Sequence, residues 1–129
     1  IRGAIDTLQA DRLRHGVRSV EDPGLLREIA ARGIVCDVCP VSNLRTRTYA
    51  TLDDHPLPAM LAAGVSCSIS TDDPAMFDTD LTREYEAAAR LGCSPRAAFG
   101  AGTRGALCDD TTRASLAAIA ESFPWDDPA

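Results

Sequence analysis

Apolar residues recur at two different spacings along the chain and predict an alternation of short strands and helices. Residues 34–39 and 65–71 are rich in β-branched side chains and have the length of strands. Residues 12–15 are a shorter candidate strand, after a helical-looking start over residues 1–9. Strands that alternate with helices indicate βα units, so we expect about three parallel strands with flanking helices.

Capping residues support the predicted helices. Asp22 is a good N-cap, Pro23 suits the first helical position, and Gly33 ends the helix that they begin. Further helices are expected near residues 57–63, beyond Pro74, over residues 81–91 and 95–107, and from Asp110 or Thr111 to about residue 123. Residues 41–54 have the composition of a long polar loop.

The chain of 129 residues has the length of one modest domain, and no linker or low-complexity segment divides it. Parallel strands need helices on both faces of the sheet or closure into a barrel. A (β/α)₈ barrel needs about 250 residues, so this chain with its three strands supplies less than half of one. We therefore expect a single unit over residues 1–129. Since the first residue is Ile1 and not Met, we expect a processed chain or a piece of a longer protein.

Composition and charge exclude several classes of protein. With 45% hydrophobic and 25% charged residues, the chain has a globular composition and not a disordered one. The net charge of −6 and the lack of a basic cluster argue against a nucleic-acid partner. No segment approaches the roughly 18 apolar residues of a membrane helix. We expect a cytoplasmic protein without a membrane partner.

The chain has five cysteines, Cys36, Cys39, Cys67, Cys93 and Cys108, and this odd number does not suggest a disulfide framework. Cys36 and Cys39 have the spacing of a redox or zinc pair. There is only one such pair, so packing of both thiols within a buried strand is the favoured interpretation.

Polar side chains follow each of the three predicted strands. His15 follows the first, Ser42 and Asn43 follow the second, and Asp72 and Asp73 follow the third. In parallel α/β folds, ligands and catalytic residues gather at the carboxyl ends of strands. Three consecutive strands that end in such residues are more informative than any one of them.

Each of these residues also has a purely structural interpretation. Asp72 and Asp73 point in different directions, so one could bind a metal while the other faces a substrate. Taken alone, the pair before Pro74 more often caps the next helix. His15 could be a general base or proton shuttle, although a lone histidine is more often structural. His55, before Pro56, is expected to be a cap or loop anchor.

Three motifs taken together resemble the adenosine deaminase family of metal-dependent purine nucleoside deaminases, in the same order and at similar spacing. The resemblance covers essentially the whole chain. Its motifs are Arg14-His15-Gly16 with Glu21-Asp22 after it, Cys39-Pro40-Val41-Ser42-Asn43, and Ser70-Thr71-Asp72-Asp73-Pro74-Ala75-Met76-Phe77, with further matches at His55-Pro56 and Glu84-Tyr85.

The resemblance implies the C-terminal portion of a TIM-type barrel, with about three of its parallel strands. It implies hydrolysis of the exocyclic amine of adenosine or deoxyadenosine by a water bound to one Zn²⁺ ion, with release of ammonia. It also implies that Asp72 ligates the metal and that His15 orients and deprotonates the metal-bound water. Asp73 would hydrogen-bond the purine and assist the attacking hydroxide.

The sequence departs from the family pattern in two respects. Arg14 stands where the family usually has glycine, and its bulk could crowd the site or re-aim His15. The family's His-x-His pair and its His-Ala-Gly-Glu motif, which carries a further metal ligand and the catalytic glutamate, are absent from this chain. Catalytic zinc sites use about three protein ligands, so we expect the isolated chain to be inactive and to need a missing N-terminal barrel half.

Several alternatives remain open. Relatives with similar motifs deaminate adenine or 6-aminodeoxyfutalosine. The chain could also be a non-catalytic truncated remnant that acts only through chain association, because an incomplete barrel exposes strand edges. An unrelated α/β domain with turn-forming aspartates is the blandest alternative. A cytidine-deaminase type of zinc site is set aside, because it needs a proline before its cysteine pair, whereas Pro40 follows this one.

Overall fold

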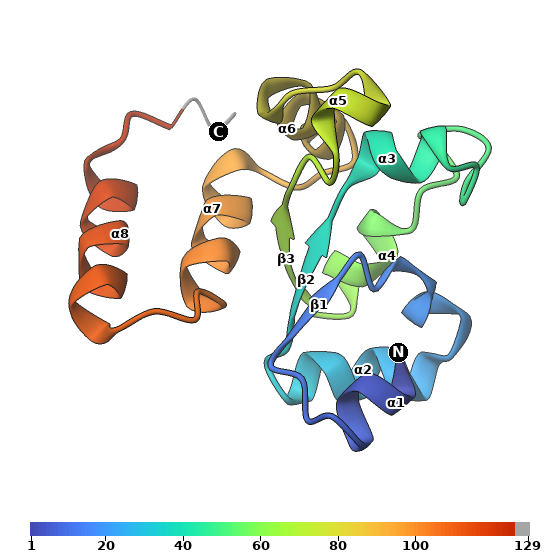
Figure 1. Cartoon of the computed structure of the whole chain (residues 1–129), viewed down its shortest axis with the longest axis horizontal. Helices are drawn as coiled ribbons and strands as arrows, with labels where there is room; N and C mark the ends of the chain where they lie inside the picture. The colour runs from blue at the N-terminus through green and yellow to red at the C-terminus, as the bar shows by residue number, and fades with distance from the viewer. Residues whose placement is uncertain (126–129) are drawn as a thin grey trace.

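The computed structural model describes residues 1–125 and follows a βα order (Figure 1). The elements are α1 (Arg2–Asp6), β1 (Arg12–Arg14), the 3₁₀ helix η1 (Val17–Glu21), α2 (Pro23–Ala31), β2 (Val35–Val38), α3 (Pro40–Arg45), α4 (Leu57–Ala62), β3 (Ser66–Ile69), α5 (Pro74–Phe77), α6 (Leu81–Arg90), α7 (Pro95–Arg104) and α8 (Asp110–Ser122). Residues 126–129 of the predicted unit lie outside the described part.

The three strands form one parallel sheet in the order β1-β2-β3, as the hydrophobic pattern predicts. Leu13 lies opposite Cys36, which in turn lies opposite Cys67. Hydrogen bonding continues one residue past the strands, because the His15 amide donates to the carbonyl of Asp37 at 2.8 Å. The sheet therefore holds in register the residues that leave its carboxyl edge.

The core lies between the sheet and the helices that connect its strands. The large side chains Ile29, Leu57 and Met60, from α2 and α4, are fully buried. They belong to one apolar cluster with Cys36, Val38, Cys67 and Ile69 of the strands. The predicted amphipathic helices and the β-branched strands thus meet as the pattern indicates.

Helix α7 lies alongside β3, and α8 packs on α7 at the far side of the molecule (Figure 1). The end of α7 also lies close to β2, and a glycine allows this close approach. A Cβ on Gly105 would stand 2.7 Å from Cγ2 of Val35, so a side chain there would force β2 or the end of α7 to move. Arg12 donates to the Gly105 carbonyl at 2.9 Å and ties this end of α7 to β1.

A polar cluster links all three strands. Arg12 of β1 donates from Nε to Oδ2 of Asp37 at 2.7 Å, and Ser68 of β3 donates to Oδ1 of the same carboxylate. Burial acts to raise the pKa of Asp37, but the hydrogen bonds from Arg12 and Ser68 outweigh it and hold the pKa below its usual value. Asp37 is thus an ionised anchor at the centre of the sheet.

The structure corrects some of the predicted elements. The expected loop over residues 41–54 begins with α3, because Pro40 starts a helical turn whose Val41 amide is bound by Glu84 from α6. The 3₁₀ helix η1 was not predicted, α1 ends at Asp6, and α7 ends at Arg104. The cap of α8 is Asp109, which accepts from the Thr112 amide at 2.7 Å, and not Asp110 or Thr111.

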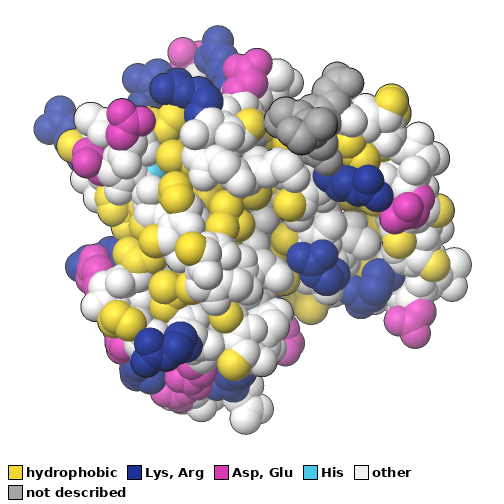
Figure 2. Space-filling model, turned by 180° about the vertical axis from the view of Figure 1, so that it is seen from behind, with side chains coloured by type: hydrophobic (Ala, Val, Ile, Leu, Met, Phe, Trp, Pro, Cys, Tyr) yellow, Lys and Arg dark blue, Asp and Glu magenta, His cyan; other side chains and the backbone are white. Residues whose placement is uncertain are grey.

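Seen from behind, apolar side chains gather over the part of the molecule that holds the sheet, and charged side chains lie mostly around its rim (Figure 2). β1 and β3 form the two edges of the described sheet. No helix within residues 1–125 combines the length and the apolar character needed to cross a membrane.

Candidate functional site

Residues from the ends of all three strands converge on the carboxylate of Asp72. Ser42 of α3 donates from Oγ to Oδ2 of Asp72 at 2.8 Å, and Arg14 donates from Nη2 to Oδ1 at 3.2 Å. The Nε2 atom of His15 lies 3.5 Å from the same Oδ2. The structure therefore brings His15, Ser42 and Asp72 together at this edge of the sheet, as the positions after the strands predict.

Asp72 and His15 both hold an unusual backbone conformation. Their φ angles are 61° and 58°, in the left-handed region that residues other than glycine seldom adopt. Such strained residues cluster at functional sites, where the surrounding contacts hold them. In this chain the contacts between the two residues and with Ser42 fix both turns at the sheet edge.

The environment of Asp72 favours its charged form. The hydrogen bond from Ser42 contributes most to lowering the pKa of the Asp72 carboxyl, and the hydrogen bond and charge of Arg14 add to it. The side chain is 28% exposed, so one side of it faces solvent. The result is an ionised, partly open carboxylate, which suits a metal ligand.

Asp73 has a different environment from its neighbour. Its Oδ1 accepts from the Met76 amide at 2.9 Å and caps α5, and the side chain is exposed. The helix-cap interpretation of the aspartate pair is therefore correct for Asp73 and wrong for Asp72. The structure does not bring the carboxylate of Asp73 into hydrogen-bond contact with Asp72 or His15.

A second set of contacts reaches the other ring nitrogen of His15, Nδ1. Asn43 lies between two histidines, with Nδ2 at 3.4 Å from Nδ1 of His15 and Oδ1 at 3.0 Å from Nε2 of His55. His55 is only 3% exposed, and its Nδ1 accepts from the Leu57 amide at 3.1 Å. Burial lowers the pKa of His55 to about 4, so the ring is neutral at ordinary pH.

Of the two predicted roles, cap or loop anchor, the structure supports the loop anchor, because the N-cap position of α4 is Pro56 and His55 precedes it. The link of His55 to His15 through Asn43 was missed. Local sequence carries no sign of this link, because the partners come from three separate segments.

A fully buried carboxylate holds α3 in place. Glu84 of α6 accepts from the Val41 amide at 3.0 Å and from Oγ1 of Thr79 at 3.2 Å. Burial raises the pKa of Glu84, and these two hydrogen bonds oppose that rise. A signal was present in the sequence, since Glu84 falls on the same helical stripe as Leu81, Ala88 and Leu91.

The structure places only Cys36 in the buried strand β2, whereas Cys39 follows β2 as the N-cap of α3. Cys36 and Cys39 are fully buried and free. Burial raises the pKa of the Cys36 thiol to about 12 and that of Cys39 to about 11, which leaves both protonated. Buried protonated thiols are poor nucleophiles and poor metal ligands.

Within residues 1–125, no three or more His, Cys, Asp or Glu side chains lie close enough to hold a metal ion together. Asp72 offers one carboxylate of the right chemistry, but a catalytic zinc site needs about three protein ligands. The residues of this chain therefore fit one part of a metal centre and do not form a complete one.

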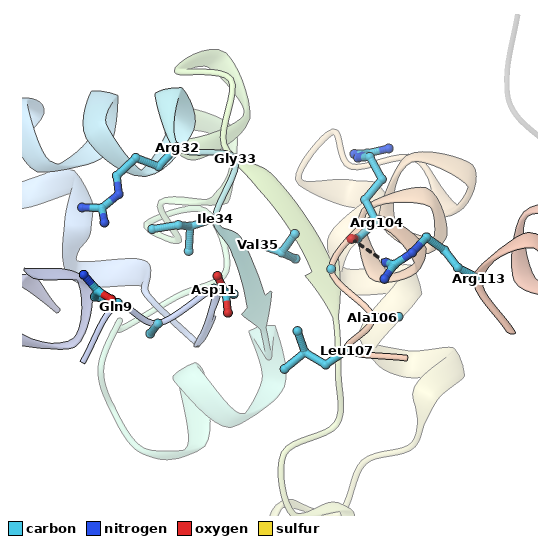
Figure 3. Close-up of a pocket in the computed structure, with 12 residues that line it drawn as sticks. Gln9, Asp11, Arg32, Gly33, Ile34, Val35, Arg104, Ala106, Leu107 and Arg113 are labelled. Atoms are coloured by element: carbon cyan, nitrogen blue, oxygen red, sulfur yellow. Dashed lines mark hydrogen bonds between the residues drawn. The ribbon is translucent and has the colours of Figure 1, made fainter. Parts of the chain in front are cut away.

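A separate cavity of about 350 Å³ opens at the opposite end of the sheet (Figure 3). Asp11, Ile34 and Val35 line it where β1 and β2 begin, and Arg113 donates to the Arg104 carbonyl at 3.1 Å beside it. In parallel α/β folds, catalytic sites lie at the carboxyl ends of the strands. The cavity is therefore distinct from the Asp72 site.

Comparisons with known proteins agree with the geometry. The family described as adenosine deaminase matches residues 1–119 of this chain. An aminodeoxyfutalosine deaminase of Acidothermus cellulolyticus is 51% identical over 125 residues, which cover 97% of this chain and 35% of that protein. An adenine deaminase of Mesorhizobium japonicum is 41% identical over 122 residues, which cover 92% and 38%.

Solved structures give the same result. The adenine deaminase of Arthrobacter aurescens superposes with a TM-score of 0.86 at 31% identity, over 93% of this chain and 38% of that one. A zinc-bound amidohydrolase from Burkholderia ambifaria superposes with a TM-score of 0.83 at 29% identity, over 93% and 35%.

The chain spans little more than a third of the length of the relatives it matches. Its three parallel strands and their helices are the C-terminal portion of the TIM-type barrel of these relatives. The match to the family over residues 1–119 and the convergence of the strand ends on Asp72 lead to one conclusion. The chain belongs to the adenosine deaminase family.

Proposed function

We propose that this chain is the C-terminal part of a longer enzyme that hydrolytically deaminates a 6-aminopurine and releases ammonia. The observation that carries the proposal is the convergence of Ser42, Arg14 and His15 on the Asp72 carboxylate at the carboxyl edge of the sheet. Membership of the family and the identities to two named deaminases support it.

The substrate class follows from the relatives more than from the geometry. Adenosine and deoxyadenosine are the default that the sequence motifs imply. The relatives named above act on aminodeoxyfutalosine and adenine, and this favours one of these two aminopurines for the enzyme that contains this chain. All four compounds carry the same reacting group, an amine on carbon 6 of a purine.

Asp72 would supply one ligand of a catalytic Zn²⁺, and the other ligands would come from sequence outside this chain. When bound, zinc lowers the pKa of its water to about 7 and makes a hydroxide available at neutral pH. Ser42 keeps the Asp72 carboxylate ionised and fixes its direction. Nε2 of His15 lies 3.5 Å from the same oxygen, so His15 would be close enough to orient a water bound beside Asp72.

Asp73 is the chain's candidate for contact with the purine. Its Oδ1 is held by the Met76 amide, so its direction at the sheet edge is fixed and its other oxygen remains for a substrate hydrogen bond. A carboxylate fixed in this way would help to hold carbon 6 towards the attacking water. This role is part of the proposal, as are those of His15 and Asp72.

A substrate panel tests the proposed reaction. Ammonia release would be measured with the complete enzyme that contains this chain, on adenine, adenosine, deoxyadenosine and 6-aminodeoxyfutalosine. We expect turnover of at least one compound, with adenine or 6-aminodeoxyfutalosine preferred. We also expect a chelator to abolish turnover and added zinc to restore it. Absence of ammonia release from every compound by zinc-loaded enzyme would favour the non-catalytic alternative.

A further inference from the structure

The hydrogen bonds around Asn43 and His55 begin at a backbone N–H group, whose role as a donor is fixed. The backbone N–H of Leu57 can only donate, and it points at Nδ1 of His55 over 3.1 Å. Nδ1 of His55 must therefore accept. This backbone group therefore determines which polar atoms of His55, Asn43 and His15 donate hydrogen bonds and which accept them.

His55 carries its proton on the other ring nitrogen. The ring is 3% exposed and neutral, because burial lowers its pKa to about 4. A neutral imidazole that accepts at Nδ1 donates from Nε2. The partner of Nε2, 3.0 Å away, is Oδ1 of Asn43, which can only accept. The Asn43 amide is thereby held in one of its two possible orientations.

The amide orientation in turn determines the state of His15. With Oδ1 turned to His55, the NH₂ group of Asn43 faces Nδ1 of His15 at 3.4 Å. An NH₂ group only donates, so Nδ1 of His15 accepts. An imidazole that accepts at Nδ1 carries its proton on Nε2, and in His15 this is the atom that lies 3.5 Å from Oδ2 of Asp72.

We propose that His55 and Asn43 are positioning residues that hold His15 in the tautomer with its proton on Nε2. His15 therefore presents an N–H group, and not a lone pair, to the space beside the Asp72 carboxylate. In the resting site it orients an oxygen there by donating a hydrogen bond. The importance of this for catalysis rests on the proposed function, whereas the tautomer itself does not.

This inference revises the role that the family resemblance implies for His15. A ring that already carries a proton on Nε2 cannot take one from a water at that atom. The orienting role is retained, and the first deprotonation of the water falls to another group. The ring of Tyr49 packs on that of His55, with their centroids 5.4 Å apart, and helps to keep the imidazole from turning.

The tautomers can be read directly by nitrogen-15 NMR of the imidazole rings. In the complete enzyme, the signals of the two histidines of this chain are assigned by their loss in His15→Phe and His55→Phe variants. Long-range proton–nitrogen correlations show which nitrogen is protonated. We expect both rings in the wild-type chain above pH 7 to be single Nε2–H tautomers. Nδ1–H at His15, or a mixture of its two tautomers, would overturn the proposal.

Two variants and a control test the connection. In His55→Phe the Asn43 amide is free to turn, and His15 should become a mixture of tautomers. In Asn43→Asp a carboxylate replaces the donor, so Nδ1 of His15 should become protonated. The control, Tyr49→Phe, keeps every atom of the chain of contacts and should leave both rings unchanged.

An unchanged His15 spectrum in folded His55→Phe or Asn43→Asp would contradict the proposed connection. If His55→Phe fails to fold, the wild-type and Asn43→Asp spectra still show whether Asn43 fixes the tautomer of His15. None of these readings depends on turnover. The two proposals can therefore fail separately. If both tautomers are as expected but the complete enzyme releases no ammonia, the proposed function is contradicted and this inference is not.

Discussion

At the scale of single residues, Arg14 is the most unusual feature of the site. It stands where the resemblance expects glycine, yet it does not displace His15, which keeps its contact with Asp72. Its half-exposed side chain instead reaches the Asp72 carboxylate, with 3.2 Å between Nη2 and Oδ1. The sequence motifs identified Asp72 and His15, but they could not show this contact, because it joins the ends of two different strands.

Replacing Arg14 should strengthen metal binding. In Arg14→Ala, Oδ1 of Asp72 loses a competing cation, so zinc affinity of the complete enzyme should rise about two- to fivefold, as expected for a partly exposed ion pair. A chelator-competition titration measures this. Arg18→Ala, which removes an exposed pair with Glu21, is the matched control and should leave affinity unchanged. Equal or weaker zinc binding by Arg14→Ala would contradict the interpretation.

His55 should make stability depend on pH. Its pKa falls from 6.5 to about 4 on folding, so between these values the unfolded chain binds a proton that the folded chain does not. The free energy of unfolding is therefore unaffected by this proton above pH 6.5, and it decreases as the pH falls from 6.5 towards 4. The loss should approach about 3 kcal/mol. Urea unfolding of the wild type and of His55→Gln from pH 4 to 7.5 measures this decrease. If the free energy of unfolding changed equally with pH in the two proteins, the decrease could not come from His55.

At the scale of elements, the strands and most helices could be predicted, because caps and apolar spacing are local signals. α2 begins at Pro23 after its Asp22 cap, as predicted. α3 could not be predicted, since its first turn is stabilised by Glu84, which lies 43 residues away. The orientation of Asn43 was equally out of reach, because α3 presents it to histidines from two other segments.

Glu84 should contribute more to folding than its place on a helix suggests. Glu84→Ala leaves the part-buried Val41 amide without its acceptor and should lower the free energy of unfolding by about 1–3 kcal/mol. Glu84→Gln should cost less, because its carbonyl can still accept from Val41 and its NH₂ can donate to Thr79. Denaturant unfolding at pH 7 measures both. A Gln variant as unstable as the Ala variant would show that these hydrogen bonds do not hold α3.

The contact between α7 and β2 should tolerate no side chain at Gly105. In Gly105→Ala the new Cβ would lie 2.7 Å from Val35, so we expect a loss of about 1–3 kcal/mol. Gly100→Ala, within α7, meets only the flexible end of Arg104 at 3.4 Å. That control should be neutral or slightly stabilising, because alanine favours helix. Thermal unfolding of both variants decides, and equal midpoints would contradict the packing described for α7.

At the scale of the whole molecule, the chain is an open sheet whose strands close into a barrel in its relatives. β1 and β3 are the edges of the described sheet, and in a barrel such edges pair with further strands. The candidate site lies at the carboxyl edge of this sheet. Under the proposed function, Asp72 is one metal ligand and the remaining ligands would come from sequence outside this chain. Neither composition nor spacing within this chain could supply those ligands, which is why the sequence predicts the site only in part.

The central claim is that Asp72 belongs to the active site of an aminopurine deaminase. Its most direct test is ammonia release by the complete enzyme carrying Asp72→Asn, with Asp110→Asn as a control at an exposed position in the first turn of α8. We predict that Asp72→Asn lowers kcat by more than about a hundredfold and reduces bound zinc, because a metal ligand is lost. Asp110→Asn should match the wild type. A folded Asp72→Asn enzyme with wild-type turnover and zinc content would contradict the claim.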